Sequence, residues 1–134
     1  MSDQIVSIKK MTLAYGDTVA VPELDLDIKK GELLALLGPS GCGKTTTMRA
    51  IAGLLAPKSG AIFIDGRDVT RVPAHKRGIG LVFQSYALFP HLSSFENVAF
   101  GLRLRKLPSA EVTVKVEAGL SSVGILHLAA RMPA

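Results

Sequence analysis

The sequence predicts an α/β fold, and three features of its pattern support that prediction. Residues 33–37 are apolar at every position, which is typical of a central parallel strand covered on both faces, and residues 79–83 predict a second apolar strand. A glycine-rich loop, residues 38–43, follows the first run. From Lys44 to Leu55, apolar side chains then recur at spacings of three and four, which predicts a helix.

The segments before the loop predict strands. Residues 19–28 alternate apolar and acidic side chains towards their end, which indicates a strand with one buried face. Residues 5–15 are a weaker strand candidate because their alternation slips near Lys9-Lys10. We expect a turn at Lys30-Gly31.

We predict that the apolar face of the first helix consists of Met48, Ile51, Ala52 and Leu55. Residues 57–60 end this helix. Residues 61–64 predict a short strand closed by an Asp65-Gly66 turn. Residues 95–102 and 110–123 predict two further helices, the second preceded by Pro108 and capped by Ser109. The last ten residues resemble the start of another helix.

The composition is that of one globular domain: the chain has 134 residues, 48% of them hydrophobic and 20% charged. A single cysteine excludes an intramolecular disulfide. The N-terminus lacks the basic and apolar regions of a secretion signal, and the longest apolar run is far too short to span a bilayer. We expect a soluble, intracellular protein.

The positive charge is concentrated in one segment. Residues 67–106 hold seven Lys/Arg and two acidic residues, and this excess equals the whole formal net charge of +5. Such a segment can face nucleic acid, an anionic membrane surface or an acidic partner, or it can be a solvated face.

The loop carries a phosphate-binding motif. Its residues fit G-x-x-x-x-G-K-[ST] in full, after an apolar strand and at a helix start: Gly38-Pro39-Ser40-Gly41-Cys42-Gly43-Lys44-Thr45. Glycines let consecutive backbone N–H groups converge on phosphate oxygens, and the helix N-terminus adds unpaired donors. We expect Lys44 to neutralise the β and γ phosphates of a nucleoside triphosphate and Thr45 to ligate Mg²⁺. The alternative is a chance glycine turn before a helix.

Two other residues, Cys42 and Asp65, each have more than one possible role in a nucleotide site. Cys42 has no adjacent base, so we expect it to supply backbone N–H rather than a nucleophile, and bound MgATP should protect its thiol from alkylation. Asp65 ends an apolar strand, as a Mg²⁺-orienting aspartate would, but Gly66 follows it and favours a turn. The three histidines show no metal-ligand spacing.

With these motifs, the chain resembles the ATP-binding subunit of ABC transporters over essentially its whole length. Residues 38–46 resemble the family's Walker A motif, and residues 83–91 resemble the Q-loop segment of bacterial importers of the polyamine, ferric-iron, phosphonate and sugar groups. The resemblance implies that Gln84, which ends an apolar strand, touches Mg²⁺ and the attacking water. It implies that Tyr15 stacks on adenine, although strand packing is the alternative, and that Ser40 and Thr46 contact the phosphates.

The expected fold is therefore a P-loop NTPase of the ABC nucleotide-binding type, incomplete, with a small antiparallel β subdomain and the start of a helical subdomain. We expect residues 1–92 to form the core with its antiparallel part, and residues 93–134 to begin the helical part. The family's signature motif, its Walker B aspartate with the following glutamate, its D-loop and its switch histidine should come later, and the resemblance ends before them. We expect the missing parallel strands to leave a sheet edge and apolar surface exposed.

The resemblance also implies partners and a place of action. These are transmembrane permease subunits, a second copy or paired nucleotide-binding subunit, and indirectly a periplasmic solute-binding protein, with no nucleic acid. The protein is expected in the cytoplasm, at the inner face of the cell membrane, where the basic segment would meet anionic lipid. Three functions stay open: an importer ATPase, a nucleotide-binding module without turnover, and a small-molecule kinase. The kinase is disfavoured because an Arg-rich lid is lacking.

Overall fold

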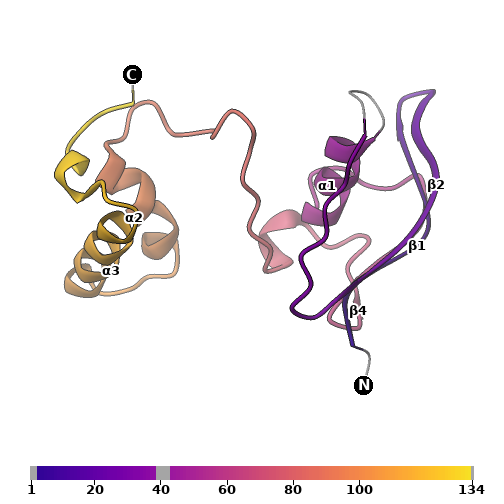
Figure 1. The fold of residues 1–134 in the computed structure, drawn as a ribbon, viewed down its shortest axis with the longest axis horizontal. Coiled ribbons are helices and arrows are strands. Elements are labelled where there is room, and N and C mark those ends of the chain that lie inside the picture. Colours follow the sequence, from indigo (N-terminus) through magenta and orange to yellow (C-terminus); the bar gives the residue numbers. More distant parts are fainter. Residues whose placement is uncertain (1–2, 39–42, 134) are drawn as a thin grey trace. The chain divides into compact units, whose positions relative to one another are not determined.

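A computed structural model of the chain describes residues 3–38 and 43–133, which fall into two compact units, Met1–Leu81 and Val82–Ala134. The first unit holds a four-stranded antiparallel sheet of order β2-β1-β3-β4. Its strands are β1 (Gln4–Tyr15), β2 (Thr18–Lys29), β3 (Ser59–Ile64) and β4 (Arg67–Asp68). Figure 1 shows β1 and β2 as one long hairpin. All the strands predicted outside the two apolar runs are thus confirmed.

A β-bulge interrupts β1 where the alternation of the sequence slips. The pairing with β2 shifts register between Ile8 and Met11, and Lys10 takes the left-handed conformation with φ 48°. Gly60 of β3 lies against this bulge, and a Cβ at Gly60 would stand 2.3 Å from the Lys10 carbonyl oxygen. The extra residue therefore needs a glycine on the facing strand, because no side chain fits between the two backbones.

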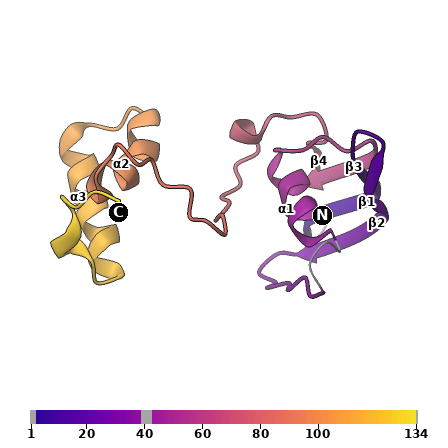
Figure 2. The same cartoon turned by 90° about the horizontal axis from the view of Figure 1, so that it is seen from above.

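Helix α1 (Lys44–Ala52) begins at the predicted residue and packs on the sheet, as Figure 2 shows. It ends three residues earlier than predicted, because Gly53 adopts φ 91° and caps its C-terminus. The predicted apolar face was wrong only at Met48, which is exposed: Ala52 is buried and Ile51 and Leu55 pack against the core, as predicted, while the helix also buries Thr47 and Ala50. The core of this unit joins Ala50 to sheet and loop residues: Ile8, Met11, Leu13, Val21, Ile62 and Val69.

The two apolar runs predicted as central parallel strands do not form strands. Leu33 is 97% exposed and Leu37 is 91% exposed, and residues 79–83 also lie outside any sheet. A strand needs backbone partners on a neighbouring strand, and within the described residues none pairs with either run. The expectation of exposed apolar surface is confirmed at Leu33 and Leu37.

The second unit is a helical pair, seen side by side in Figure 2. Helix α2 (Ser94–Leu104) and helix α3 (Ser109–Ser122) share a core of Ala99, Val112, Val116 and Leu120. The predicted Ser109 cap was wrong, because Pro108 precedes the helix and Ser109 is its first residue. Short 3₁₀ turns follow β4 at Ala74–Lys76 and follow α3 at Leu126–Leu128, the latter where another helix start was predicted. In the described part of the chain, no helix is long and apolar enough to cross a membrane.

Candidate functional site

The motif residues meet at the N-terminus of α1, where Gly43 makes the turn into the helix. Gly43 has φ 92°, and a Cβ there would lie 2.7 Å from the Val21 Cγ2 atom of β2. Its carbonyl accepts hydrogen bonds from the Thr47 amide at 2.8 Å and from the Thr47 hydroxyl at 2.7 Å. Both the left-handed conformation and the close approach to β2 require glycine at this position.

This helix end is open to an anion. The helix has no side-chain N-cap and no acidic residue in its first turn. The unpaired N–H groups and the positive end of the helix dipole are therefore not neutralised by any side chain among the described residues. The Lys44 ammonium folds back and donates a hydrogen bond to the Gly38 carbonyl oxygen, so the two ends of the motif are brought together.

The remaining motif residues divide into two groups. Ser40, Gly41 and Cys42 lie outside the described residues. Thr45 is exposed on the first turn of α1, and Thr46 is half-buried beside it. The structure therefore brings Gly38, Gly43 and the threonines to one helix end.

Tyr15 reaches the same helix from the end of β1. The side chains of Thr46, foremost, and of Arg49 interact with its hydroxyl group and lower the pKa of Tyr15 below its ordinary value of 10.0. The residue is 48% exposed, so its ring is accessible beside α1. Sequence reasoning missed Arg49, which follows the motif and carries no spacing signal of its own.

An apolar hollow of about 420 Å³ lies beside this helix end. Leu34 and Leu36 form one wall, while Lys44 and Thr45 stand on α1. The other lining residues are Leu26, Ile28, Met48 and Ile51. Leu33, Leu34 and Leu37 are all exposed, so the 33–37 segment is largely open rather than covered on both faces as predicted.

Gln84 belongs to the second unit, where it is exposed in a turn closed by the Tyr86 amide on the Phe83 carbonyl at 3.0 Å. The segment that follows is pinned to α2 by Asn97. The Asn97 Oδ1 atom accepts from the Phe89 amide at 2.9 Å. Its Nδ2 atom donates to three carbonyls, those of Phe89, Leu92 and Ser93.

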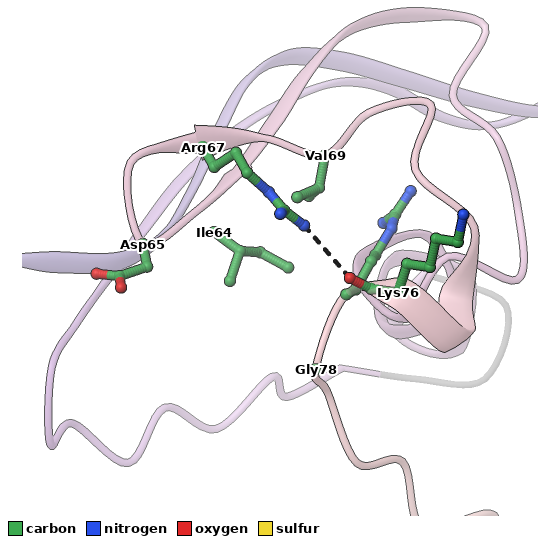
Figure 3. A pocket seen from close by; sticks show the side chains of 7 residues that line it. Ile64, Asp65, Arg67, Val69, Lys76 and Gly78 are labelled. Atoms are coloured by element: carbon green, nitrogen blue, oxygen red, sulfur yellow. Dashed lines mark hydrogen bonds between the residues drawn. The ribbon is translucent and has the colours of Figure 1, made fainter. Parts of the chain in front are cut away.

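A second hollow, of about 370 Å³, is lined by charged residues and lies next to β4 (Figure 3). There the Arg67 guanidinium donates to the Lys76 carbonyl at 3.3 Å. Asp65 forms an ion pair with Lys30 at 3.2 Å, and with φ 49° it makes the predicted turn between β3 and β4. The turn interpretation of Asp65-Gly66 is thus confirmed.

The basic segment is less uniform than its sequence suggests. Arg77 is only 7% exposed, and burial lowers the pKa of its guanidinium. Arg103 pairs with Glu96, and all three basic residues at the end of α2, Arg103, Arg105 and Lys106, are exposed. Within the described ranges, no group of three or more His, Cys, Asp or Glu side chains could hold a metal ion.

Comparison with known proteins finds relatives that all belong to one family. The family model described as ABC transporter matches residues 21–134. The Fe(3+) ions import ATP-binding protein FbpC of Photobacterium profundum is 52% identical over 124 residues, which is 92% of this chain and 35% of that protein. The spermidine/putrescine import ATP-binding protein PotA of Aggregatibacter actinomycetemcomitans is 50% identical over 129 residues, with 96% and 35% covered. The chain thus spans about a third of the length of these curated relatives.

Among solved structures, cbiO1 of Clostridium perfringens, described as part of the ABC transporter complex cbiONQ, matches with a TM-score of 0.81 at 34% identity. The match covers 98% of this chain and 55% of that one. The chain belongs to the ABC transporter family, and its fold is that of the family's nucleotide-binding domain.

Proposed function

We propose that this chain binds MgATP at the N-terminus of α1. The residues assigned to the phosphates are Gly38, Ser40, Gly41, Cys42, Gly43, Lys44, Thr45 and Thr46. The observation that carries the proposal is the N-terminus of α1, which has no side-chain cap. Gly43 precedes it in the left-handed conformation, and Lys44 is its first residue. Backbone N–H groups and a helix dipole left free of acidic side chains favour a polyphosphate over a neutral ligand.

Mg²⁺ would be held by Thr45 and Gln84. Both offer exposed side-chain oxygens, and oxygen is the ligand type that Mg²⁺ prefers. The ion would neutralise the charge of the phosphates when bound. Lys44 would exchange its hydrogen bond with the Gly38 carbonyl for the β and γ phosphate oxygens. Gln84 would in addition orient the attacking water in the complete enzyme.

Tyr15 would bind the base. A ring that is half exposed can stack on adenine, and its hydroxyl interacts with Thr46 and Arg49 of the phosphate-binding helix. The same interactions reduce the conformational entropy that the ring would lose on binding. This supports a nucleotide role for Tyr15 rather than strand packing alone.

We further propose that the chain belongs to the ATP-binding subunit of a bacterial importer of a small solute, with residues 1–92 as the core and 93–134 as the start of the helical part. The curated relatives are named import ATP-binding proteins for ferric ions or polyamines. Its partners would be permease subunits, a second nucleotide-binding subunit and, indirectly, a periplasmic solute-binding protein. It would act in the cytoplasm, on the inner face of the membrane.

The surface proposed for the permease lies on the segment that Asn97 pins. Tyr86, Leu88 and Phe89 are exposed there, and the Phe89 ring packs on that of Phe100 with centroids 4.5 Å apart. An exposed aromatic and aliphatic cluster on an ordered loop is typical of an interaction surface. Arg103, Arg105 and Lys106 at the end of α2 are exposed and would face anionic lipid. Charge reversal at Arg103 and Arg105 should then weaken membrane association of the full complex, and unchanged association would remove this part of the proposal.

For the chain alone we propose nucleotide binding without appreciable turnover. The sequence lacks the signature motif and the carboxylate that would follow an apolar strand as a catalytic base. Purified residues 1–134 should therefore bind ATP and ADP, with AMP much weaker because the phosphates supply the binding energy, and should release no phosphate above background.

Two variants make this experiment decisive. Lys44→Ala should abolish binding, and Lys115→Ala, an exposed lysine of α3 paired with Glu111, should bind as the wild type does. Sustained phosphate release that Lys44→Ala abolishes would show that the chain is a complete catalyst. Equal binding by both variants would place the nucleotide elsewhere.

A further inference from the structure

One buried cation, Arg77, lies apart from the motif, and no carboxylate among the described residues pairs with it. Arg77 is 7% exposed, and each of its hydrogen bonds goes to a backbone carbonyl. Its Nη1 atom donates to Ala50 at 2.7 Å and to Ile51 at 3.0 Å, both in the last turn of α1. Its Nε and Nη2 atoms donate to Val72 at 2.8 Å and Thr70 at 3.3 Å.

These contacts join α1 to the sheet through one side chain. The Thr70 hydroxyl oxygen accepts from the Ile62 amide of β3 at 2.9 Å, so the connection runs from β3 through Thr70 and Arg77 to the end of α1. The helix C-terminus presents unpaired carbonyls and the negative end of its dipole, which explains why a cation is stable there without an acidic residue. Lysine offers no planar fork and could not reach both groups of carbonyls at once.

The close packing of the 3₁₀ turn Ala74–Lys76 on α1 also indicates that the segment around Arg77 holds the end of this helix. A Cβ at Gly53 would lie 2.8 Å from the Ala74 Cα atom and 2.9 Å from the Arg77 Nε atom. The backbone around Arg77 is therefore seated directly against the end of α1. Because α1 has nine residues, an anchor at its C-terminus also fixes the direction in which its N-terminal N–H groups point.

We propose that Arg77 is a positioning residue of the nucleotide site, an inference that rests on the proposed function. By holding the C-terminal carbonyls of α1 to the loop after β4, it sets the orientation of the helix whose other end carries Gly43 and Lys44. The residue touches no nucleotide; it acts through α1.

The first readout is nucleotide affinity of Arg77→Lys at a temperature where circular dichroism shows every variant folded. We expect the Kd for MgATP to rise about tenfold or more, since small misplacements of binding groups are costly. Ile62→Val, in the core of the same unit, serves as the matched control and should change the Kd by less than about twofold. Equal Kd changes in the two variants would reduce Arg77 to a general stability role and overturn the proposal.

The second readout needs no nucleotide. The Thr47 amide is bonded to the Gly43 carbonyl at the far end of α1, and the Asp65 amide is bonded to the Ile5 carbonyl in the sheet. In Arg77→Met, hydrogen exchange at Thr47 should accelerate relative to Asp65, while Ile62→Val leaves this ratio unchanged. An unchanged ratio in Arg77→Met overturns the proposal even if the chain binds ATP. If the wild type binds no ATP, the proposed function fails and the exchange ratio alone decides the role of Arg77 in orienting α1.

Discussion

Gly53 and Ala74 are in such close contact that no side chain fits between them: a Cβ at Gly53 would lie 2.8 Å from the Ala74 Cα atom and 2.9 Å from its amide nitrogen. Gly53 also has φ 91°, which favours glycine independently of space. The end of α1 and the 3₁₀ turn at Ala74–Lys76 are therefore fitted to one another through a single glycine.

This contact predicts the effect of a small substitution. Gly53→Ala should lower the free energy of unfolding by about 2 kcal/mol, because the left-handed conformation and the clash with backbone act together. Gly101→Ala is the matched control, since Gly101 lies inside α2 with open space around its Cα, and it should be neutral or stabilising by up to about 1 kcal/mol. Urea denaturation measures both, and a Gly53→Ala variant as stable as Gly101→Ala would contradict the described packing.

A second prediction concerns pH. The Ser7 hydroxyl donates to the Asp27 carboxylate at 2.6 Å, and this bond, more than the nearby Lys9 ammonium, holds the pKa of Asp27 below its ordinary value of 3.8. A lowered pKa means that the folded state favours the carboxylate, so the stabilisation is present at neutral pH. It is lost as pH falls through the folded-state pKa.

Ser7→Ala should therefore raise the pKa of Asp27 towards 3.8, and Lys9→Ala should raise it less. The stability difference between wild type and Ser7→Ala should be constant near neutral pH and shrink below the ordinary pKa. Carboxyl carbon chemical shifts followed through an acid titration measure the pKa directly. A larger shift in Lys9→Ala than in Ser7→Ala would reverse the order of causes.

Asn97 offers a third prediction, in the second unit. Asn97→Ala removes the four contacts that pin residues 89–93, and should destabilise this unit by about 1–2 kcal/mol. Asn97→Asp keeps the acceptor for the Phe89 amide but loses the three donated bonds. Hydrogen exchange at Phe89 should therefore accelerate in the alanine variant and stay slow in the aspartate variant. Slow exchange in both would show that the loop is held by other contacts.

Local signals in the sequence were sufficient for much of the fold. The start of α1 at Lys44, the Asp65-Gly66 turn and the slip near Lys9-Lys10 each depend on residues adjacent in the chain, and the structure has all three. The N-cap of α2 could also have been found, because Ser93 and Glu96 have the spacing of a capping box and the Ser93 hydroxyl accepts from the Glu96 amide at 3.1 Å.

Features set by distant contacts were not predictable in this way. The run at residues 33–37 reads as a buried strand, but pairing depends on neighbours that the described residues do not supply. Met48 fits the apolar spacing of α1, yet contact with the sheet selects the face carrying Thr47 and Ala50. Arg77 counted only as one charge in a basic segment, and its carbonyl partners at Ala50 and Ile51 are 27 and 26 residues away.

The measurement that tests the central claim most directly is a titration of the chain with MgATP, followed through the backbone amide resonances of Gly43 and Lys44. These two amides lie where the motif enters α1, so binding there should shift them in a saturable manner. The same titration of Lys44→Ala should show no saturable shift at Gly43, while the core resonances of the second unit, such as Val116, stay unchanged in both proteins. Saturable shifts confined to other residues, or none at all, would contradict the assignment of this helix end as the nucleotide site.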